Sequence, residues 1–190
     1  MVTAILFDCF GVLLTDALAV MVDEFAKKDP EAADQIRELA IMTSRGILSR
    51  QDFTEQTATI LDITPDELRT RVATGEVKNQ ELFAYIIELR KQYKTGLLSN
   101  VSSEGFWRRF SHEELAPYFD DVILSAEIGH AKPDPEAYKI AAERIGTPPS
   151  ECLLIDDRED YLAGARATGM QGILYESVAG LRKSLGGINY

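Results

Sequence analysis

Five short apolar runs, each followed at once by polar residues or by the start of a helix, constrain the fold of this chain more than any other feature. They cover residues 2–7, 95–98, 122–124, 152–155 and 172–175. Each run is too short for a helix and rich in aliphatic side chains, which is typical of a strand buried on both faces. Segments with helical periodicity separate the last four runs, so the sequence predicts repeated strand–helix units and a parallel sheet. We expect an α/β fold with helices flanking this sheet.

A long helical segment separates the first two runs. Residues 8–94 show helical periodicity, as at Leu18, Met21, Val22 and Phe25, and no convincing strand. A crossover between parallel strands needs only about a dozen residues. We therefore predict a core domain of residues 1–15 and 78–190 and an inserted helical domain of residues 16–77.

Composition limits the partners that this chain can have. Its 190 residues include 20 basic and 31 acidic side chains, a net charge of −11, which opposes binding to nucleic acid. A small anionic substrate needs only a few local cations. The longest apolar runs fall short of the ~20 residues of a membrane span, so no membrane partner is expected.

Location and assembly are predicted from weaker signals. The N-terminal residues have no basic region and no small-residue cleavage site, so no signal peptide is expected. Cys9 and Cys152 both lie in apolar runs, which favours buried thiols over a disulfide. We expect a cytoplasmic protein, monomeric or homodimeric.

Polar residues at the ends of the predicted strands are the candidates for chemistry. Asp8, Ser99 and Asp156 follow three of the apolar runs, and the carboxyl ends of parallel strands meet at one edge of a sheet, where ligands bind. Asp8 stands on an abrupt turn, with Gly11 allowing the backbone to fold back, and is a plausible carboxylate nucleophile.

The remaining candidates suit an anionic reaction centre. Ser99 and Asn100 can donate hydrogen bonds to the oxygens of a phosphoryl group. Lys132 supplies a positive point charge. Asp157 together with Asp8 can hold Mg²⁺, a hard cation that prefers oxygen ligands.

The motifs resemble those of the haloacid dehalogenase-like hydrolase superfamily, in the branch with a helical, C1-type cap inserted after the first motif. The resemblance covers residues 5–175 and is most specific in Lys132-Pro133-Asp134-Pro135 and Leu154-Ile155-Asp156-Asp157. It implies a Rossmann-like core and a Mg²⁺ cofactor, with a small phosphorylated substrate in the phosphatase branch. Its site residues would be Asp8 as nucleophile, Ser99 as phosphate binder, Lys132 as stabiliser, Asp157 as metal ligand assisted by Asp156, and Phe10 as a ligand through its backbone carbonyl.

Residue 45 is the candidate substrate contact in the cap. The stretch Arg45-Gly46-Ile47-Leu48-Ser49 also resembles the family. Arg45 is therefore a candidate for binding the substrate, with a surface ion pair as the alternative.

Phe10 is the departure from the family pattern. Phosphatases of the family usually carry at this place an Asp that protonates the leaving group and later activates water, and Phe does neither. General acid–base help is typically worth about 10²- to 10⁴-fold, so slow turnover of alkyl phosphates is expected. Dehalogenases of the family carry Tyr here but lack the acidic pair Asp156-Asp157.

Three hypotheses therefore follow. The first is a Mg²⁺-dependent phosphatase that forms an aspartyl-phosphate at Asp8. The second is a 2-haloacid dehalogenase-like hydrolase of carbon–halogen bonds, and the third is a phosphometabolite-binding protein with little catalysis. The acidic pair favours the phosphatase.

Overall fold

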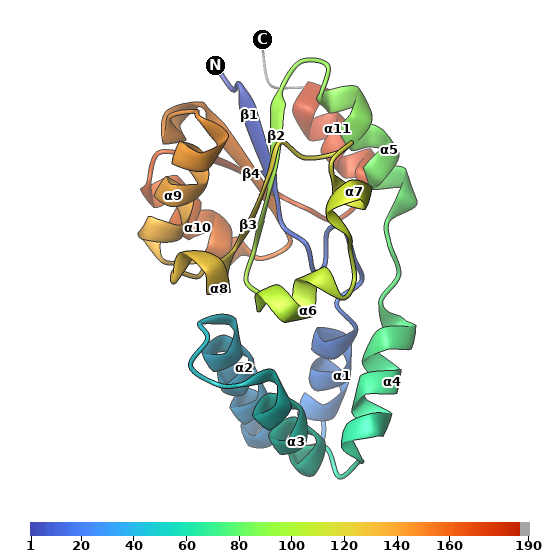
Figure 1. Ribbon diagram of the computed structural model, residues 1–190. Coiled ribbons are helices and arrows are strands. Elements are labelled where there is room, and N and C mark those ends of the chain that lie inside the picture. Colours follow the sequence, from blue (N-terminus) through green and yellow to red (C-terminus); the bar gives the residue numbers. More distant parts are fainter. Residues whose placement is uncertain (187–190) are drawn as a thin grey trace.

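The computed structural model describes residues 1–186, which contain a five-stranded parallel sheet (Figure 1). Its strands are β1 (Ala4–Phe7), β2 (Lys94–Ser99), β3 (Asp121–Leu124), β4 (Cys152–Asp156) and β5 (Gln171–Leu174). Their order in the sheet is β3-β2-β1-β4-β5. From β1 the chain adds β2 and β3 on one side of the sheet, and it then crosses back to add β4 and β5 on the other side. The predicted α/β, Rossmann-like fold is confirmed.

Helices cover both faces of the sheet (Figure 1). Helices α5 (Gln80–Leu89) and α11 (Val178–Gly186) lie on one face, and α9 (Pro135–Ile145) and α10 (Glu159–Ala167) lie on the other. Successive residues of β1 point to opposite faces, so Ile5 and Phe7 pack with the first pair of helices and Ala4 and Leu6 with the second. Burial on both faces explains why this strand is a continuous apolar run.

Shorter elements also connect the strands. They are α6 (Ser103–Trp107), α7 (His112–Leu115), α8 (Ser125–Ile128) and a 3₁₀ turn at Pro149–Glu151.

Four helices form a separate group below the sheet in Figure 1, called here the helical insertion. They are α1 (Ala17–Ala26), α2 (Pro30–Ser44), α3 (Arg50–Ile60) and α4 (Pro65–Gly75). Val22, Ala33 and Ile36 form a small core of their own in this group. At the start of helix α2, the Asp29 carboxylate accepts a hydrogen bond from the amide of Ala32 at 3.0 Å and so caps the helix.

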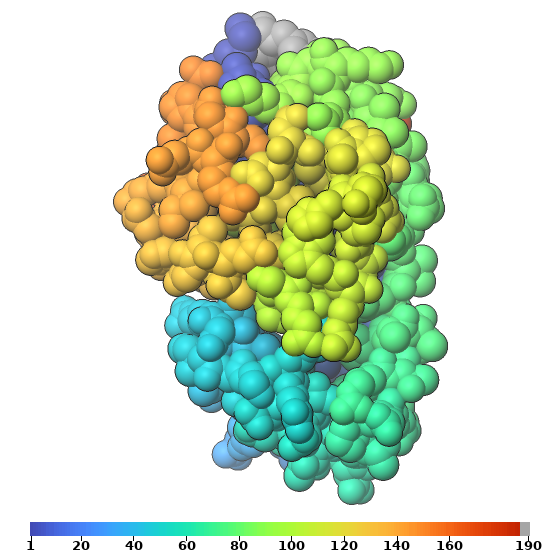
Figure 2. Space-filling view, in the orientation of Figure 1, coloured from blue at the N-terminus to red at the C-terminus, as the bar shows by residue number. Residues whose placement is uncertain are grey.

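The two chain segments that join the helical insertion to the core run side by side. The amide of Thr15 donates to the carbonyl of Val77 (3.1 Å), and the amide of Asn79 donates to the carbonyl of Leu13 (2.9 Å). On the opposite side, the buried hydroxyl of Ser125 donates to the carbonyl of Ser44 at the end of α2 (2.7 Å). The insertion is therefore closed against the core (Figure 2).

The predicted domain ranges relate simply to these elements. Residues 16–77 begin one residue before α1 and end two residues after α4, while the last four residues of the predicted core range lie outside the described residues. Among residues 1–186, none of the helices has the length and apolarity that a membrane span needs.

Candidate active site

The candidate active site lies at the carboxyl edge of the three central strands. Asp8 follows β1 directly, and its amide donates to the carbonyl of Ile155 in β4 at 2.9 Å. Ser99 is the last residue of β2 and Asp156 the last of β4. These strands flank β1, so the three polar side chains converge as the sequence predicts. They are buried, with exposed fractions of 5% for Asp8 and 0% for Ser99 and Asp156.

Lys132 lies between two of these carboxylates. Its ammonium group is 2.8 Å from Oδ1 of Asp8 and 2.5 Å from Oδ2 of Asp156, and its side chain is fully buried. Burial alone would lower the pKa of Lys132, but the two carboxylates outweigh it and raise that pKa above its ordinary value. Lys132 is therefore a permanent cation that fixes the position of the Asp8 carboxylate.

Asp8, Asp156 and Asp157 form a carboxylate cluster. One oxygen from each lies within 4.8 Å of the others. Burial and the charge of Asp156 raise the pKa of Asp8 to about 7 and the pKa of Asp157 to about 6. The single ammonium of Lys132 thus leaves this cluster with an excess of negative charge.

The cluster fits a hard divalent cation. Its donor atoms are all oxygens, the set that Mg²⁺ prefers, and the backbone carbonyl of Phe10 lies in the turn beside Asp8. Burial and the charge of Asp156 raise the pKa values of Asp8 and Asp157, and a cation at this point would offset both effects. The oxygens of Asp156 are less available to a cation than those of Asp8 and Asp157. Its Oδ2 binds Lys132, and its Oδ1 accepts a hydrogen bond from the amide of Arg158 at 3.0 Å.

Gly11 makes room for Asp157. Its backbone has a φ of +82°, which L side chains rarely adopt, and a Cβ atom placed on it would lie 2.0 Å from Oδ2 of Asp157. The turn after Asp8 therefore needs glycine for two reasons, the backbone conformation and the approach of the Asp157 carboxylate.

Replacing Gly11 by Ala is expected to raise the Mg²⁺ concentration required for half-maximal activity by about 10- to 100-fold, because the methyl group displaces Asp157. Gly169→Ala is the matched control. Gly169 also has a positive φ, +95°, but nothing lies within 4 Å of the added Cβ atom. A Mg²⁺ titration of both variants separates backbone strain from loss of the carboxylate. Equal shifts in the two variants would contradict the role given to Asp157.

Ser99 has an unused hydroxyl group. Its Oγ is buried and has no hydrogen-bond partner within residues 1–186. A buried hydroxyl left without a partner costs about 1–3 kcal/mol, so such a group at a ligand site indicates that the ligand supplies the partner. This geometry supports the predicted contact between Ser99 and an anionic substrate.

The side chain of Asn100 binds the backbone of Lys132. Its Nδ2 donates to the carbonyl of Lys132 (2.7 Å), and its Oδ1 accepts the amide of Lys132 (2.8 Å). This pair of bonds holds the loop that carries the lysine, a contact that sequence reasoning missed.

Phe10 forms part of a pocket wall next to the site. Its half-buried ring lies 5.2 Å from the guanidinium carbon of Arg109, which in turn forms a two-point ion pair with Glu76. Arg109 belongs to the core and Glu76 follows α4, so this pair also joins the helical insertion to the core. Nothing in the sequence indicated a pair of residues 33 positions apart.

Arg45 and Arg50 lie in different surroundings. Arg45 is exposed at the end of α2, and it does not line the pocket next to Phe10. Arg50, the first residue of α3, does line that pocket.

Comparison with known proteins identifies the family of this chain. The family model for haloacid dehalogenase-like hydrolases matches residues 2–169. The chain therefore belongs to the haloacid dehalogenase-like hydrolase family.

Two curated relatives are named as phosphatases. "Phosphatase MT3486" of Mycobacterium tuberculosis is 38% identical over 92 residues, a match that covers 46% of this chain and 41% of that protein. The chain thus matches less than half the length of this relative. "D-ribitol-5-phosphate phosphatase" of Bacteroides thetaiotaomicron is 29% identical over 201 residues and is covered to 97%, as is this chain.

Solved structures share the fold. A haloacid dehalogenase family enzyme from Bacteroides thetaiotaomicron, solved as a magnesium complex, has a TM-score of 0.75 at 21% identity, with 96% of this chain and 98% of that chain covered. The L-2-haloacid dehalogenase of Xanthobacter autotrophicus, with chloropropionic acid covalently bound, has a TM-score of 0.66 at 18% identity, with coverages of 99% and 84%. Because a magnesium-binding family enzyme and a dehalogenase both share this fold, the fold alone does not select the reaction, and the site residues must do so.

Proposed function

We propose that this protein is a Mg²⁺-dependent phosphatase that forms an aspartyl-phosphate at Asp8 and acts on a small phosphorylated metabolite. The observation that carries the proposal is the carboxylate of Asp8, held by Lys132 beside Asp157 and the unpartnered hydroxyl of Ser99. These groups provide a nucleophile, a fixed cation, a metal ligand and a hydrogen-bond donor at one edge of the sheet.

In the first half-reaction, a carboxylate oxygen of Asp8 attacks phosphorus, and the bond from phosphorus to the leaving oxygen breaks. The hydroxyl of Ser99 donates to a phosphoryl oxygen, and Lys132 neutralises part of the charge on the reacting groups. Bound Mg²⁺ would supply further neutralisation and orient the phosphoryl group, with Asp8, Asp157 and the carbonyl of Phe10 as its predicted ligands.

In the second half-reaction, water attacks the phosphorus of the aspartyl-phosphate, which releases inorganic phosphate and restores Asp8. The side chain of Phe10 neither protonates the leaving group nor accepts a proton from this water. We assign both proton transfers to solvent, since residue 10 supplies no acid or base. Substrates with good leaving groups, such as aryl or acyl phosphates, are therefore favoured over alkyl phosphates.

Phe10→Asp is expected to raise kcat/KM for alkyl phosphates by about 10²-fold, the low end of general acid catalysis, and to raise it less for aryl phosphates. The gain stays at the low end because the guanidinium of Arg109 lies beside residue 10 and favours the charged form of a carboxylate there. Steady-state kinetics with one alkyl and one aryl phosphate measure the two effects. Equal changes for both substrates would show that protonation of the leaving group does not limit turnover.

The dehalogenase is the second candidate, because Phe10 places an aromatic side chain where dehalogenases of the family carry Tyr. The carboxylate cluster favours the phosphatase, since it suits a cation that a dehalogenase does not require. Phosphate release from an aryl phosphate is therefore expected with Mg²⁺ and not with EDTA, and no halide release from 2-haloacids. Halide release without added metal would instead favour the dehalogenase. Binding of phosphometabolites without any turnover would select the third hypothesis.

The predicted substrate contact of Arg45, the cytoplasmic location and the monomeric or homodimeric state belong to the same proposal. They rest on the family resemblance and on the composition of the chain.

A further inference from the structure

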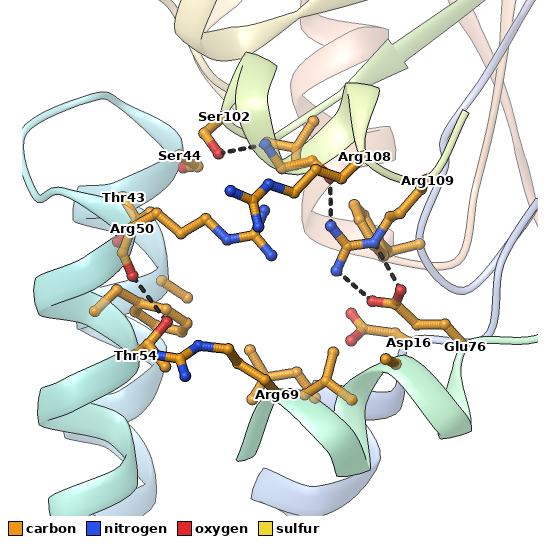
Figure 3. Close-up of a pocket in the computed structure, with 18 of the residues that line it drawn as sticks. Asp16, Thr43, Ser44, Arg50, Thr54, Arg69, Glu76, Ser102, Arg108 and Arg109 are labelled. Atoms are coloured by element: carbon orange, nitrogen blue, oxygen red, sulfur yellow. Dashed lines mark hydrogen bonds and ion pairs between the residues drawn. The ribbon is translucent and has the colours of Figure 1, made fainter. Parts of the chain in front are cut away.

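A pocket of about 480 Å³ lies between the helical insertion and the core, next to the candidate active site. Phe10 and Asn100 belong to its wall, so it opens beside the phosphoryl position proposed above. Helices α2, α3 and α4 supply one side of the pocket, and α6 with the residues around it supplies the other. Figure 3 shows the polar side chains that point into it.

Positive charge predominates in this pocket. Within the described part of the chain, four arginines line it, namely Arg50, Arg69, Arg108 and Arg109, against two acidic residues, Asp16 and Glu76. Both acidic side chains lie together at the Arg109 end, opposite Arg50 (Figure 3). Glu76 is already paired with Arg109, and Asp16 accepts the amide of Ala19 as the N-cap of α1. Of the described residues, none with an acidic side chain therefore lines the Arg50 end of the pocket.

Among the four pocket arginines, Arg50 differs in having no ion pair with any described residue. Arg69 pairs with Asp66 and Arg108 with Glu104, both on the exposed surface, whereas Arg50 forms no ion pair within residues 1–186. Its Nη1 atom is buried and has no hydrogen-bond partner in the same range. Burial and the nearby charges of Arg109 and Arg108 lower the pKa of Arg50. Removing a guanidinium nitrogen from water without a hydrogen-bond partner has a free-energy cost, which an anion bound to Arg50 would offset.

Gly105 allows Arg50 to reach this position. A Cβ atom on Gly105, in α6 of the core, would lie 3.1 Å from Nη1 of Arg50 and 2.8 Å from Oγ of Ser102. The guanidinium group thus crosses from the helical insertion to the surface of the core, where Arg108 also points into the pocket (Figure 3).

We propose that this pocket binds a second oxyanion of the substrate, and that Arg50 with Arg108 recognises it. The inference rests on the proposed function and names its substrate class: phosphate esters that carry a carboxylate or a second phosphate at the end remote from the reacting phosphoryl group. Arginine suits this role, since its planar fork binds carboxylate and phosphate oxygens by two parallel hydrogen bonds. Phe53, Leu68 and Val72 also line the pocket and suit a short apolar linker in the substrate.

Binding of phosphonates tests this inference without requiring turnover. A series of ω-carboxyalkylphosphonates of increasing chain length is compared by calorimetry, in the presence of Mg²⁺, with alkylphosphonates of the same lengths. We expect at least one carboxylated member to bind the protein about tenfold or more tightly than its uncharged counterpart. Arg50→Gln should remove most of this difference, and Arg50→Lys should retain a part of it.

Arg71→Gln is the matched control variant. Arg71 lies on α4 of the same insertion, is half exposed and pairs with Glu67 outside the pocket, so its removal should leave the preference intact. Thermal unfolding of all three variants verifies that each is folded. Equal binding of the two series by the unmodified protein, or an equal loss of preference in Arg71→Gln, would overturn the inference.

Phosphonate binding and aryl phosphate hydrolysis, measured on the same protein, test this inference and the proposed function separately. Mg²⁺-dependent hydrolysis of an aryl phosphate with no preference for carboxylated phosphonates would contradict the second-oxyanion pocket and leave the phosphatase intact. A clear preference that depends on Arg50, without hydrolysis of any phosphate, would support the pocket and contradict the phosphatase.

Discussion

Lys132→Met is expected to reduce both stability and activity severely. The ammonium group of Lys132 is fully buried and is the cation that contacts Asp8 and Asp156 together. Its removal leaves two buried carboxylates without compensation, so the free energy of unfolding should fall by about 3–5 kcal/mol, the cost of breaking a buried ion pair. The rate of aryl phosphate hydrolysis should fall on the order of 10³-fold, because Lys132 also stabilises the developing charge.

Lys139→Met is the control for this prediction. Lys139 is an exposed lysine of α9 that pairs with Glu136, and surface pairs of this kind contribute about 0–1 kcal/mol. Denaturant unfolding and steady-state kinetics measure both variants. If Lys132→Met were as stable and as active as the control, the buried ion pairs would not have the role that the geometry gives them.

The sheet could be predicted because each strand carries a strong local signal. The run before Asp8 is apolar at every position, and its two faces meet helices on both sides, so burial and periodicity agree. The convergence of Asp8, Ser99 and Asp156 then followed from topology, since parallel neighbours end at the same edge.

The pocket could not be predicted in the same way. Its residues come from the helical insertion and from the core, and their meeting depends on how the insertion closes. Arg109 and Glu76 are 33 positions apart and belong to no periodic pattern, and Arg50 appears in the sequence as an ordinary first residue of a helix. Sequence reasoning therefore selected Arg45, which shares the family stretch, and not Arg50.

The position of Asp156 could be predicted from the sequence, but its hydrogen-bond partners could not. The resemblance indicates a residue that assists the metal. In the structure, both of its oxygens already have partners: Oδ2 binds Lys132, and Oδ1 accepts the amide of Arg158. Lys132 is 24 residues away from Asp156 in the chain, and no local pattern encodes that contact.

Asp8→Asn should abolish phosphoryl transfer. The amide that replaces the carboxylate is a poor nucleophile and forms no acyl phosphate, so the rate should fall on the order of 10⁴-fold or more. The change nearly preserves the size of a buried side chain next to Lys132, so a loss of activity in a folded variant reports on chemistry.

The most direct test of the central claim is hydrolysis of an activated aryl phosphate by the unmodified protein and by Asp8→Asn, each with Mg²⁺ and with EDTA. An aryl leaving group needs little protonation, so the assay does not depend on the acid that Phe10 lacks. We predict phosphate release by the unmodified protein with Mg²⁺, and none with EDTA or by Asp8→Asn. Release that persists in EDTA or in Asp8→Asn would contradict a metal-assisted reaction through Asp8.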